Sequence, residues 1–349
     1  MSSCQKTPMF ATRSKAASRA ILVALLILLA PRSGALAAQD KPYMMKITLA
    51  TVDDVVHRFA KDYAAAVEKD SGGRIKAEVY PASQLGSIQR QIEGIQFGAI
   101  QAAVIPPEFF VTVDERFEIL TAPGLVTTMA EGQRLAANPK VLNLMLGLGA
   151  GKGLHGVGLF MTSPSSVISK APIRHLVDFN GKKIRIFASQ FQSVALQRLG
   201  AIPKPMTLGE VLPALHDNII DGAVSALAVI TPMNFQVAAK YVTEIGQPAI
   251  FGIVEISKKW YDSLPADLQQ IVDKDGAAGT LAVNRVATEI LDRARQDWIS
   301  GGGELISLPA QEQSAMINTL ASVGEDVSAI KPELHAAYHI ISEAAQRTR

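Results

Sequence analysis

Cysteine is nearly absent from this chain of 349 residues, and the one that is present, Cys4, lies near the N-terminus. A disulfide framework or a multi-cysteine metal site needs at least two thiols, so the sequence excludes both. Cys4 also precedes the apolar run of residues 20–30 instead of following it, which is the wrong order for a lipid-bearing cysteine. The chain therefore tolerates an oxidising compartment without depending on it.

A membrane-spanning run is missing at the N-terminus, because the apolar segment of residues 20–30 has 11 residues and a bilayer span needs about 20. Basic residues precede this segment, and Ala35, Leu36 and Ala37 follow it with the small-residue pattern of a cleavage site. We therefore predict that residues 1–37 are a signal peptide for export, with an uncleaved anchor as the alternative.

A large excess of charge of one sign is also absent. The full chain has 34 Lys and Arg, 32 Asp and Glu, and a formal net charge of +2. The predicted signal peptide holds five of the basic residues and none of the acidic ones, so its removal changes the net charge to −3. The excess of basic over acidic residues in the full chain therefore comes from the predicted signal peptide. Because the remaining chain has a net negative charge, we expect no nucleic-acid partner.

Catalytic motifs are missing as well. The glycine-rich segment 147–153 lacks the spacing of a phosphate-binding P-loop and follows a predicted helix, where a P-loop requires a strand. Ser163, Ser165 and Ser166 are predicted to lie in a serine-rich turn and not in a G-x-S-x-G nucleophile motif. Since no nucleophile has an acid or base spaced to assist it, we predict no enzyme, no catalytic residue and no cofactor.

The six histidines include one pair at the helical i, i+4 spacing, His335 and His339. Zinc-binding helices of the H-E-x-x-H type share this spacing, but no glutamate lies between these two. We interpret the pair as a surface or packing feature and predict no metal site.

Apolar periodicity predicts an α/β protein in which strands and helices alternate, and such alternation is typical of a parallel sheet. The first half has the order strand, helix, strand, helix, strand. The expected strands are 45–50, 74–80, 99–106, 157–161, 184–187, 219–227 and 251–257, and the expected long helices are 56–70, 88–97, 128–146 and 266–300.

Two lobes are expected, because about 312 residues remain after the predicted cleavage and a single core usually holds fewer. We take strand 157–161 as the crossing into the second lobe and strand 251–257 as the crossing back. This division places lobe I at residues 38–160 plus 251–290 and lobe II at residues 161–250 plus 291–349.

Arg185 stands inside an otherwise apolar strand, where alternation puts Ile184 and Ile186 on one face and Arg185 on the other. The planar fork of a guanidinium matches a carboxylate with two hydrogen bonds, so an arginine in this position is a candidate anion-binding group. The alternative is an arginine that points to solvent.

The residues around Arg185 predict strand, helix and strand again. Asn180 and Gly181 supply a turn before the strand, and Ser189 can cap the following helix. Thr207 and Glu210 have the T-x-x-E spacing of a capping box, which opens another helix. Ser225 then lies at the far end of a buried strand.

The segments DFNGKKIR (residues 178–185) and LGAIPKPMTLGEVLPALHDNIIDG (residues 199–222) resemble the signature of the solute-binding proteins of TRAP (tripartite ATP-independent periplasmic) transporters, the C4-dicarboxylate-binding-like family. Weaker similarity extends over GGRIKAEVYPASQLGS and KKWYDSLPADLQQIV. The resemblance implies two hinged α/β lobes with a long helix spanning both, a periplasmic location and no catalysis. It also implies an organic-acid ligand gripped by Arg185, and membrane transporter subunits as partners. We expect a monomer.

The chain departs from this family at two positions that bear on the ligand. The family usually has an asparagine where this chain has Ser225, and a hydroxyl lacks the two donors and the reach of an amide. Some members also have a second arginine about twenty residues before the first, where this chain has Ser165. We therefore expect a monocarboxylate with an apolar or aromatic body in preference to a dicarboxylate.

A ligand held at the carboxyl ends of the strands would meet residues from both lobes. Phe187 could form an apolar wall beside Arg185, or could be a packed core aromatic. Pro106 would stiffen its loop and help to present Glu108 or the backbone. The predicted substrate-binding residues are Arg185, Ser225, Phe187, Ser165, Thr51, Pro106 and Glu108, with Asp53 also near the first strand.

Two other functions stay open at this point. A solute-binding protein of an ATP-driven transporter or of a sensor would share the hinge and differ only in its partner. An α/β enzyme would need a convergent acid, base and nucleophile in the cleft.

Overall fold

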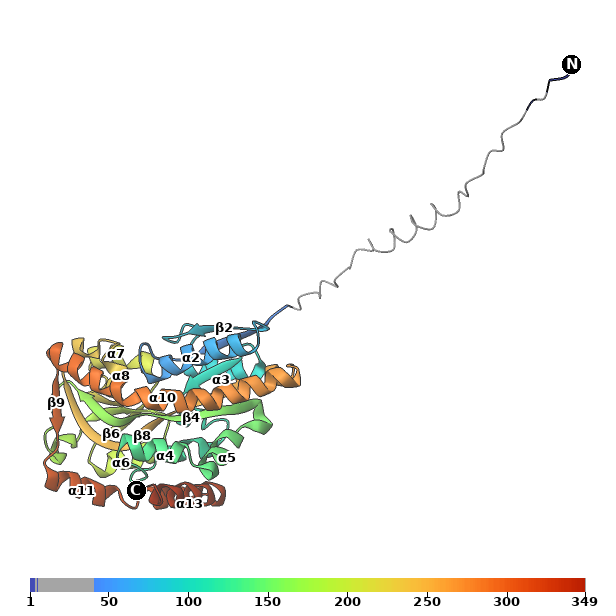
Figure 1. Ribbon diagram of the computed structural model, residues 1–349. Coiled ribbons are helices and arrows are strands. Elements are labelled where there is room, and N and C mark those ends of the chain that lie inside the picture. The colour runs from blue at the N-terminus through green and yellow to red at the C-terminus, as the bar shows by residue number, and fades with distance from the viewer. Residues whose placement is uncertain (4, 6–40, 349) are drawn as a thin grey trace. The chain divides into compact units, whose positions relative to one another are not determined.

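The structure is a computed structural model that describes residues 1–3, 5 and 41–348. Cys4 and residues 6–37 of the predicted signal peptide lie outside the described residues. Residues 42–348 contain a nine-stranded sheet in the order β2-β1-β3-β8-β4-β7-β5-β6, with β9 paired to β8 (Figure 1).

The first half of the sheet forms as the sequence predicts. It comprises β1 (Tyr43–Thr48), α2 (Val55–Asp70), β2 (Ile75–Tyr80), α3 (Ile88–Phe97) and β3 (Ala102–Ile105). β1 pairs in parallel with both β2 and β3. Asp54 caps α2 by accepting a hydrogen bond from the backbone N–H of His57, and Gly98 ends α3 in the left-handed conformation that glycine adopts easily.

The second half repeats this order around Arg185. It comprises β5 (Lys183–Ile186), α6 (Gln190–Arg198), β6 (Ile202–Pro205), α7 (Leu208–His216) and β7 (Gly222–Ser225). β5 pairs in parallel with both β6 and β7. The predicted caps are present, since Ser189 accepts from the N–H of Gln192 and Thr207 forms a capping box with Glu210.

Two long antiparallel strands join the halves, β4 (Leu154–Ser169) and β8 (Tyr241–Ser257). β8 pairs with β3 of the first half, and β4 pairs with β7 of the second, both antiparallel. The prediction of short crossing strands was therefore wrong in length. Parallel pairing holds inside each half and between β8 and β9 (Glu304–Ser307), whereas the joining strands pair antiparallel with both halves. The predicted serine-rich turn at residues 163–166 was also wrong.

The residues of that expected turn continue β4 through irregular pairing. The register between β4 and β8 shifts between Gly156 and Gly158, between Met161 and Ser163, and between Pro164 and Ser166. Proline has no N–H to donate to a neighbouring strand, so a sheet accepts it at a bulge. Residues 163–166, which have the composition of a turn, therefore form bulges within β4, because β8 pairs with β4 on both sides of them.

The predicted long helix is present as α10 (Ala266–Ser300), which spans 35 residues. Leu268 and Val272 pack with the core around β1 and α2, whereas Leu291, Ala294 and Trp298 pack with the core around α7 and β7. α10 therefore covers both halves of the sheet. No helix among the described residues, α10 included, combines the length and apolar character needed to cross a membrane.

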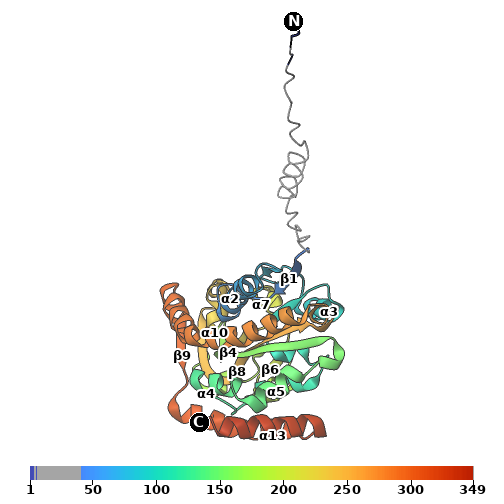
Figure 2. The same cartoon turned by 45° about the vertical axis from the view of Figure 1, so that its right-hand side comes forward.

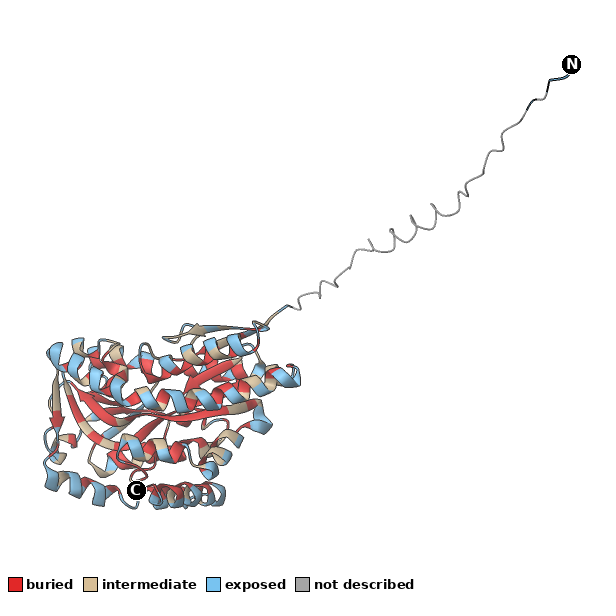
Figure 3. Ribbon diagram, in the orientation of Figure 1, coloured by how far each residue is buried: buried red, intermediate tan, exposed pale blue. Residues whose placement is uncertain are grey.

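Helices cover both faces of the sheet, with α2 and α10 on one face and α4 (Met129–Ala136), α5 (Pro139–Gly147) and α13 (Pro332–Gln346) on the other (Figures 1 and 2). The strands between them are mostly buried (Figure 3). The single helix expected at residues 128–146 is divided because Asn138 caps a new helix with Pro139 at its first position. The remaining elements are η1 (Pro107–Phe110), η2 (Glu115–Thr121), η3 (Ala150–Lys152), η4 (Leu176–Phe179), α8 (Leu227–Ile230), η5 (Phe235–Val237), α9 (Lys258–Tyr261), β9 (Glu304–Ser307), α11 (Ala310–Leu320) and α12 (Val323–Ser328).

Candidate functional site

Arg185 is completely buried in β5 and does not point to solvent. Its Nε donates to the carbonyl of Met206 at 2.9 Å, and its Nη1 donates to the carbonyl of Val224 at 3.0 Å. Its Nη2 is buried and has no hydrogen-bond partner among the described residues. Two backbone carbonyls thus hold the guanidinium in place and leave one end of the fork free to bind a ligand.

A cavity of about 40 Å³ lies against Arg185 between the two halves of the fold. This volume exceeds the roughly 10–15 Å³ that one water molecule needs and is far below the roughly 300 Å³ of typical ligand pockets. A ligand of more than a few atoms therefore requires the halves to separate. The lining residues are Ala50, Thr51, Val56, Ile88, Val104, Ile105, Pro106, Phe109, Thr162, Arg185, Phe187, Leu208, Ser225, Ala226, Val229 and Ile250.

The charge beside this cavity is positive at neutral pH. Burial lowers the pKa of Arg185 to about 10, opposed by the negative charge of Glu108, so the guanidinium stays protonated. Glu108 is itself buried, and burial raises its pKa to about 8, outweighing the attraction of Arg185. The carboxyl group is therefore mostly neutral at pH 7, which leaves Glu210, a weaker influence on Arg185 than Glu108, as the ionised carboxylate that attracts the guanidinium. The site is complementary to an anion.

Aromatic rings form one wall of the cavity. The guanidinium carbon of Arg185 lies 4.3 Å from the centre of the Phe187 ring, within the range of a cation–π contact. The Phe187 ring in turn lies 5.7 Å from that of Phe109, tilted by 58°. Phe187 thus lines the cavity and also packs against another aromatic ring, so both interpretations of this residue from the sequence apply.

Five of the seven predicted site residues line this cavity: Thr51, Pro106, Arg185, Phe187 and Ser225. The hydroxyl of Thr51 donates to Asp54 at 2.9 Å, so it is already engaged. Ser225 is buried and lines the same cavity at the end of β7.

The other predicted residues lie elsewhere. Glu108 is buried close enough to influence the pKa of Arg185 but does not line the cavity. Ser165 lines a separate cavity of about 300 Å³, and Asp53 lines a third. Thr162 lies within the range of residues 161–165 that the sequence places near the pocket, and it lines the cavity. The sequence missed Ile250, because its position depends on how β4 and β8 pair.

The cavity that Ser165 lines is larger, but its arginine is already neutralised. Arg295 donates from Nε and Nη2 to Glu244 at 3.0 and 2.8 Å, and from Nη1 to Asp292 at 3.1 Å. A second anion would compete with these carboxylates. The smaller cavity, with its unpaired buried guanidinium, is therefore the better candidate for acid binding.

Comparison with known proteins agrees with this architecture. The family model described as bacterial extracellular solute-binding protein, family 7, matches residues 48–329. The C4-dicarboxylate-binding periplasmic protein DctP of Rhodobacter capsulatus is 26% identical over 294 residues, which cover 83% of this chain and 88% of that protein.

Two solved structures have the same fold at low sequence identity. The sugar acid binding protein of Advenella mimigardefordensis, in complex with galactonate, is 19% identical with a TM-score of 0.82 over 88% of this chain and 99% of its own. A TRAP periplasmic solute-binding protein of Desulfovibrio salexigens, with bound orotic acid, is 22% identical with a TM-score of 0.79 over 88% of this chain and 100% of its own. The predicted two-lobed α/β fold is confirmed.

Proposed function

The chain belongs to the bacterial extracellular solute-binding proteins of family 7, and we propose that it binds an organic acid at Arg185 and delivers it to the membrane subunits of a TRAP transporter. The predicted family is confirmed, as is the periplasmic location, which the named relatives share. Proteins of this family are solute-binding components of transport systems.

The observation that carries the proposal is the free end of the Arg185 guanidinium. A buried cation is costly to a fold unless something compensates it, and two neutral carbonyls compensate it only in part. A ligand carboxylate at Nη2 would supply the missing charge and a short charge-assisted hydrogen bond.

The small cavity supports a mechanism of opening and closing. An open form would admit the ligand, and contacts from both halves would favour the closed form once it is bound. The bulges in β4 and β8 are the places where the joining strands depart from regular pairing. We retain the division into lobe I (residues 38–160 plus 251–290) and lobe II (residues 161–250 plus 291–349) as a proposal.

The lining of the cavity favours a monocarboxylate with an apolar or aromatic body. Arg185 is the one cationic residue among the lining residues, so a second carboxylate would find no partner there. The rings of Phe109 and Phe187 offer an apolar surface beside the guanidinium. The Desulfovibrio salexigens protein binds orotic acid, a planar ring with one carboxylate, in the same fold.

Catalysis is not part of the proposal. None of the histidines in the described residues lines the cavity, and Ser225 there has no base beside it. We propose a monomeric binding protein without a nucleic-acid partner. A solute-binding protein of an ATP-driven transporter or a sensor would have the same cavity, and the identity of neighbouring membrane-subunit genes separates these partners.

The test is a thermal-shift screen against monocarboxylic, dicarboxylic, aromatic and sugar acids, with neutral solutes as controls. A ligand at a hundred times its Kd stabilises the fold by about 2.7 kcal/mol. Arg185→Met should lower affinity for the best acid by about 2–5 kcal/mol, at least about 30-fold, because the carboxylate loses its buried partner. The variant should remain folded, since it also removes a buried cation.

Arg295→Met is the matched control, because Arg295 lines the larger cavity. Binding lost in this variant and retained in Arg185→Met would move the site to that cavity. Binding only of neutral solutes would contradict the acid-binding proposal.

A further inference from the structure

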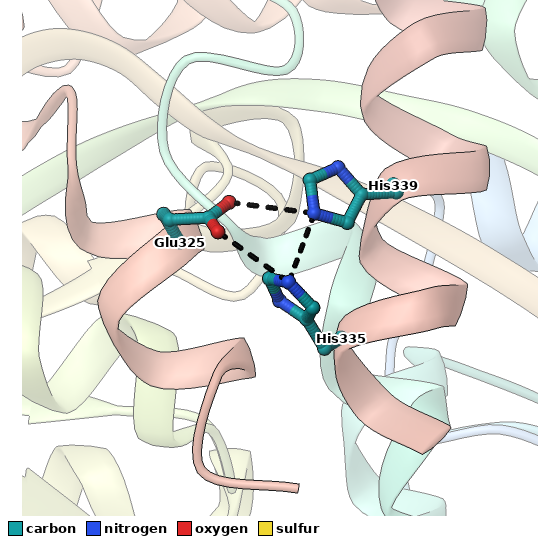
Figure 4. A group of neighbouring side chains, drawn as sticks. All are labelled: Glu325, His335 and His339. Carbon is teal, nitrogen blue, oxygen red and sulfur yellow. Dashed lines mark hydrogen bonds and ion pairs between the residues drawn. The ribbon is translucent and has the colours of Figure 1, made fainter. Parts of the chain in front are cut away.

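A second group of ligating side chains lies on the C-terminal helices, outside the Arg185 cavity. Glu325 of α12 faces His335 and His339 of α13, and all three side chains converge (Figure 4). The ligating atoms of the three residues lie within 4.8 Å of one another. The sequence contained the histidine pair, but Glu325 comes from a different helix and no local motif could include it.

The distances match those of a divalent metal site. His335 Nε2 lies 3.1 Å from His339 Nε2 and 3.5 Å from Glu325 Oε1, and His339 Nε2 lies 3.7 Å from Glu325 Oε2. Zinc–ligand bonds of about 2.0–2.1 Å at tetrahedral angles place neighbouring ligand atoms about 3.3 Å apart. The separation of the two Nε2 atoms and that of His335 Nε2 from Oε1 each lie within about 0.2 Å of this spacing, while His339 faces the other carboxylate oxygen, Oε2.

A hydrogen bond to Ser328 orients one of the imidazoles. The Ser328 hydroxyl lies 3.3 Å from the carbonyl of Glu325, to which it donates its one proton, and 3.2 Å from Nδ1 of His335. With its proton on that carbonyl, the hydroxyl accepts from Nδ1–H of His335, and this tautomer has its lone pair on Nε2. Metal-binding histidines commonly have such a partner at the other ring nitrogen.

The same arrangement without a metal is less well balanced. Without a metal, the Nε2 lone pair of His335 faces a carboxylate oxygen of Glu325, which is also an acceptor. Nε2 of His339 has at most one proton when the ring is neutral, so it can donate either to His335 or to Glu325 but not to both. A cation at the centre would be bound by all three groups.

We propose that Glu325, His335 and His339 form a binding site for a divalent transition-metal ion, with zinc the best match. Three protein ligands leave the fourth tetrahedral position open to water or to a ligand from another molecule. Two imidazoles select zinc, copper or nickel over magnesium and calcium, which prefer oxygen ligands.

A bound ion would cross-link two parts of the C-terminal region. α12 packs against α6, which follows the strand of Arg185, whereas α13 packs against η2 and α5. The ion would join these helices across the loop between them, so zinc should raise the melting temperature. This site is independent of the proposed acid binding, because none of its residues lines the Arg185 cavity.

The experiment uses protein purified from cells that express the full chain, without a polyhistidine tag, and treated with chelator. Calorimetric titration with Zn²⁺ should show one ion bound per chain. His335→Ala and His339→Ala should each weaken binding by at least about tenfold, and Ser328→Ala, which removes only the orienting hydroxyl, by roughly 10–100-fold. Replacement of zinc by Co²⁺ should give the visible absorption of a tetrahedral site.

Glu333→Gln and His216→Ala are the controls, since Glu333 is an exposed acid on the same helix and His216 an exposed histidine outside the cluster. Both should bind zinc as the wild type does, and Ca²⁺ and Mg²⁺ should not compete. No heat of binding with the wild type would overturn the proposal. So would unchanged zinc affinity in a folded His335→Ala/His339→Ala double variant.

Discussion

Glu108→Gln should make the fold less sensitive to alkaline pH. Burial raises the pKa of Glu108 to about 8 from an ordinary value of 4.5, so the folded chain keeps a proton that the unfolded chain releases. Stability falls with pH wherever the folded state binds more protons. The cost is nearly absent below pH 4.5 and grows until the pH passes 8.

The size of this effect follows from the two pKa values. One pKa unit corresponds to about 1.4 kcal/mol, so the retained proton costs the wild type about 3 kcal/mol at pH 7 and about 4 kcal/mol at pH 8. Glutamine has nearly the same shape and no proton to release. Between pH 4.5 and 8 the wild type should therefore lose about 4 kcal/mol more of unfolding free energy than Glu108→Gln.

Urea denaturation at several pH values measures this difference. Comparing the two proteins across pH cancels the contributions of all other titrating groups. Glu93→Gln is the control, because Glu93 is exposed, and its pH dependence should follow the wild type. Parallel stability curves for the wild type and Glu108→Gln would refute the assignment of a neutral Glu108 beside Arg185.

Two further predictions concern the core. Glu255 is fully buried in β8, and neither of its carboxylate oxygens has a hydrogen-bond partner within the described chain. Burial raises its pKa well above the ordinary value, so the folded chain keeps a proton that the unfolded chain releases. Glu255→Gln should therefore raise the urea midpoint at pH 8 and not at pH 4. Gly276→Ala should destabilise the fold by about 1–3 kcal/mol in calorimetry, because a Cβ there would lie 2.8 Å from both Cγ2 and the carbonyl oxygen of Val157. Gly147→Ala, which meets no atom within 4 Å, should leave the melting temperature unchanged and serves as its control.

The elements that the sequence predicted well are those whose signals are local. The strand of Arg185 and the caps at Ser189 and Thr207 depend on residues within a few positions of one another. Arginine in an apolar strand was enough to select the candidate site. The other cavity-lining residues that the sequence predicted lie at strand ends, and they could be predicted because parallel strands end at the same edge of a sheet.

The prediction of the crossing strands was wrong because their extent depends on residues far away in the sequence. Ser163 to Ser166 have the composition of a turn, and only pairing with residues about 80 positions later in β8 makes them a strand. The register shifts in that pairing also place Ser165 on a different cavity from Arg185. Likewise Glu325 joins the two histidines through tertiary packing, which no spacing along α13 encodes.

The central place of β8 has a consequence for the time course of synthesis. β3 pairs with β8 through Ala102 and Ile256, which are about 150 residues apart in the chain. At roughly 5–20 residues per second, a ribosome needs about 8–30 seconds to add the missing partner. During that interval the inner edge of β3 has no strand beside it, so the emerging chain cannot complete its sheet. A chain whose sheet is still incomplete can pass through a secretion channel in an unfolded form. The same delay lengthens the period in which chaperones must cover the unpaired edge of β3.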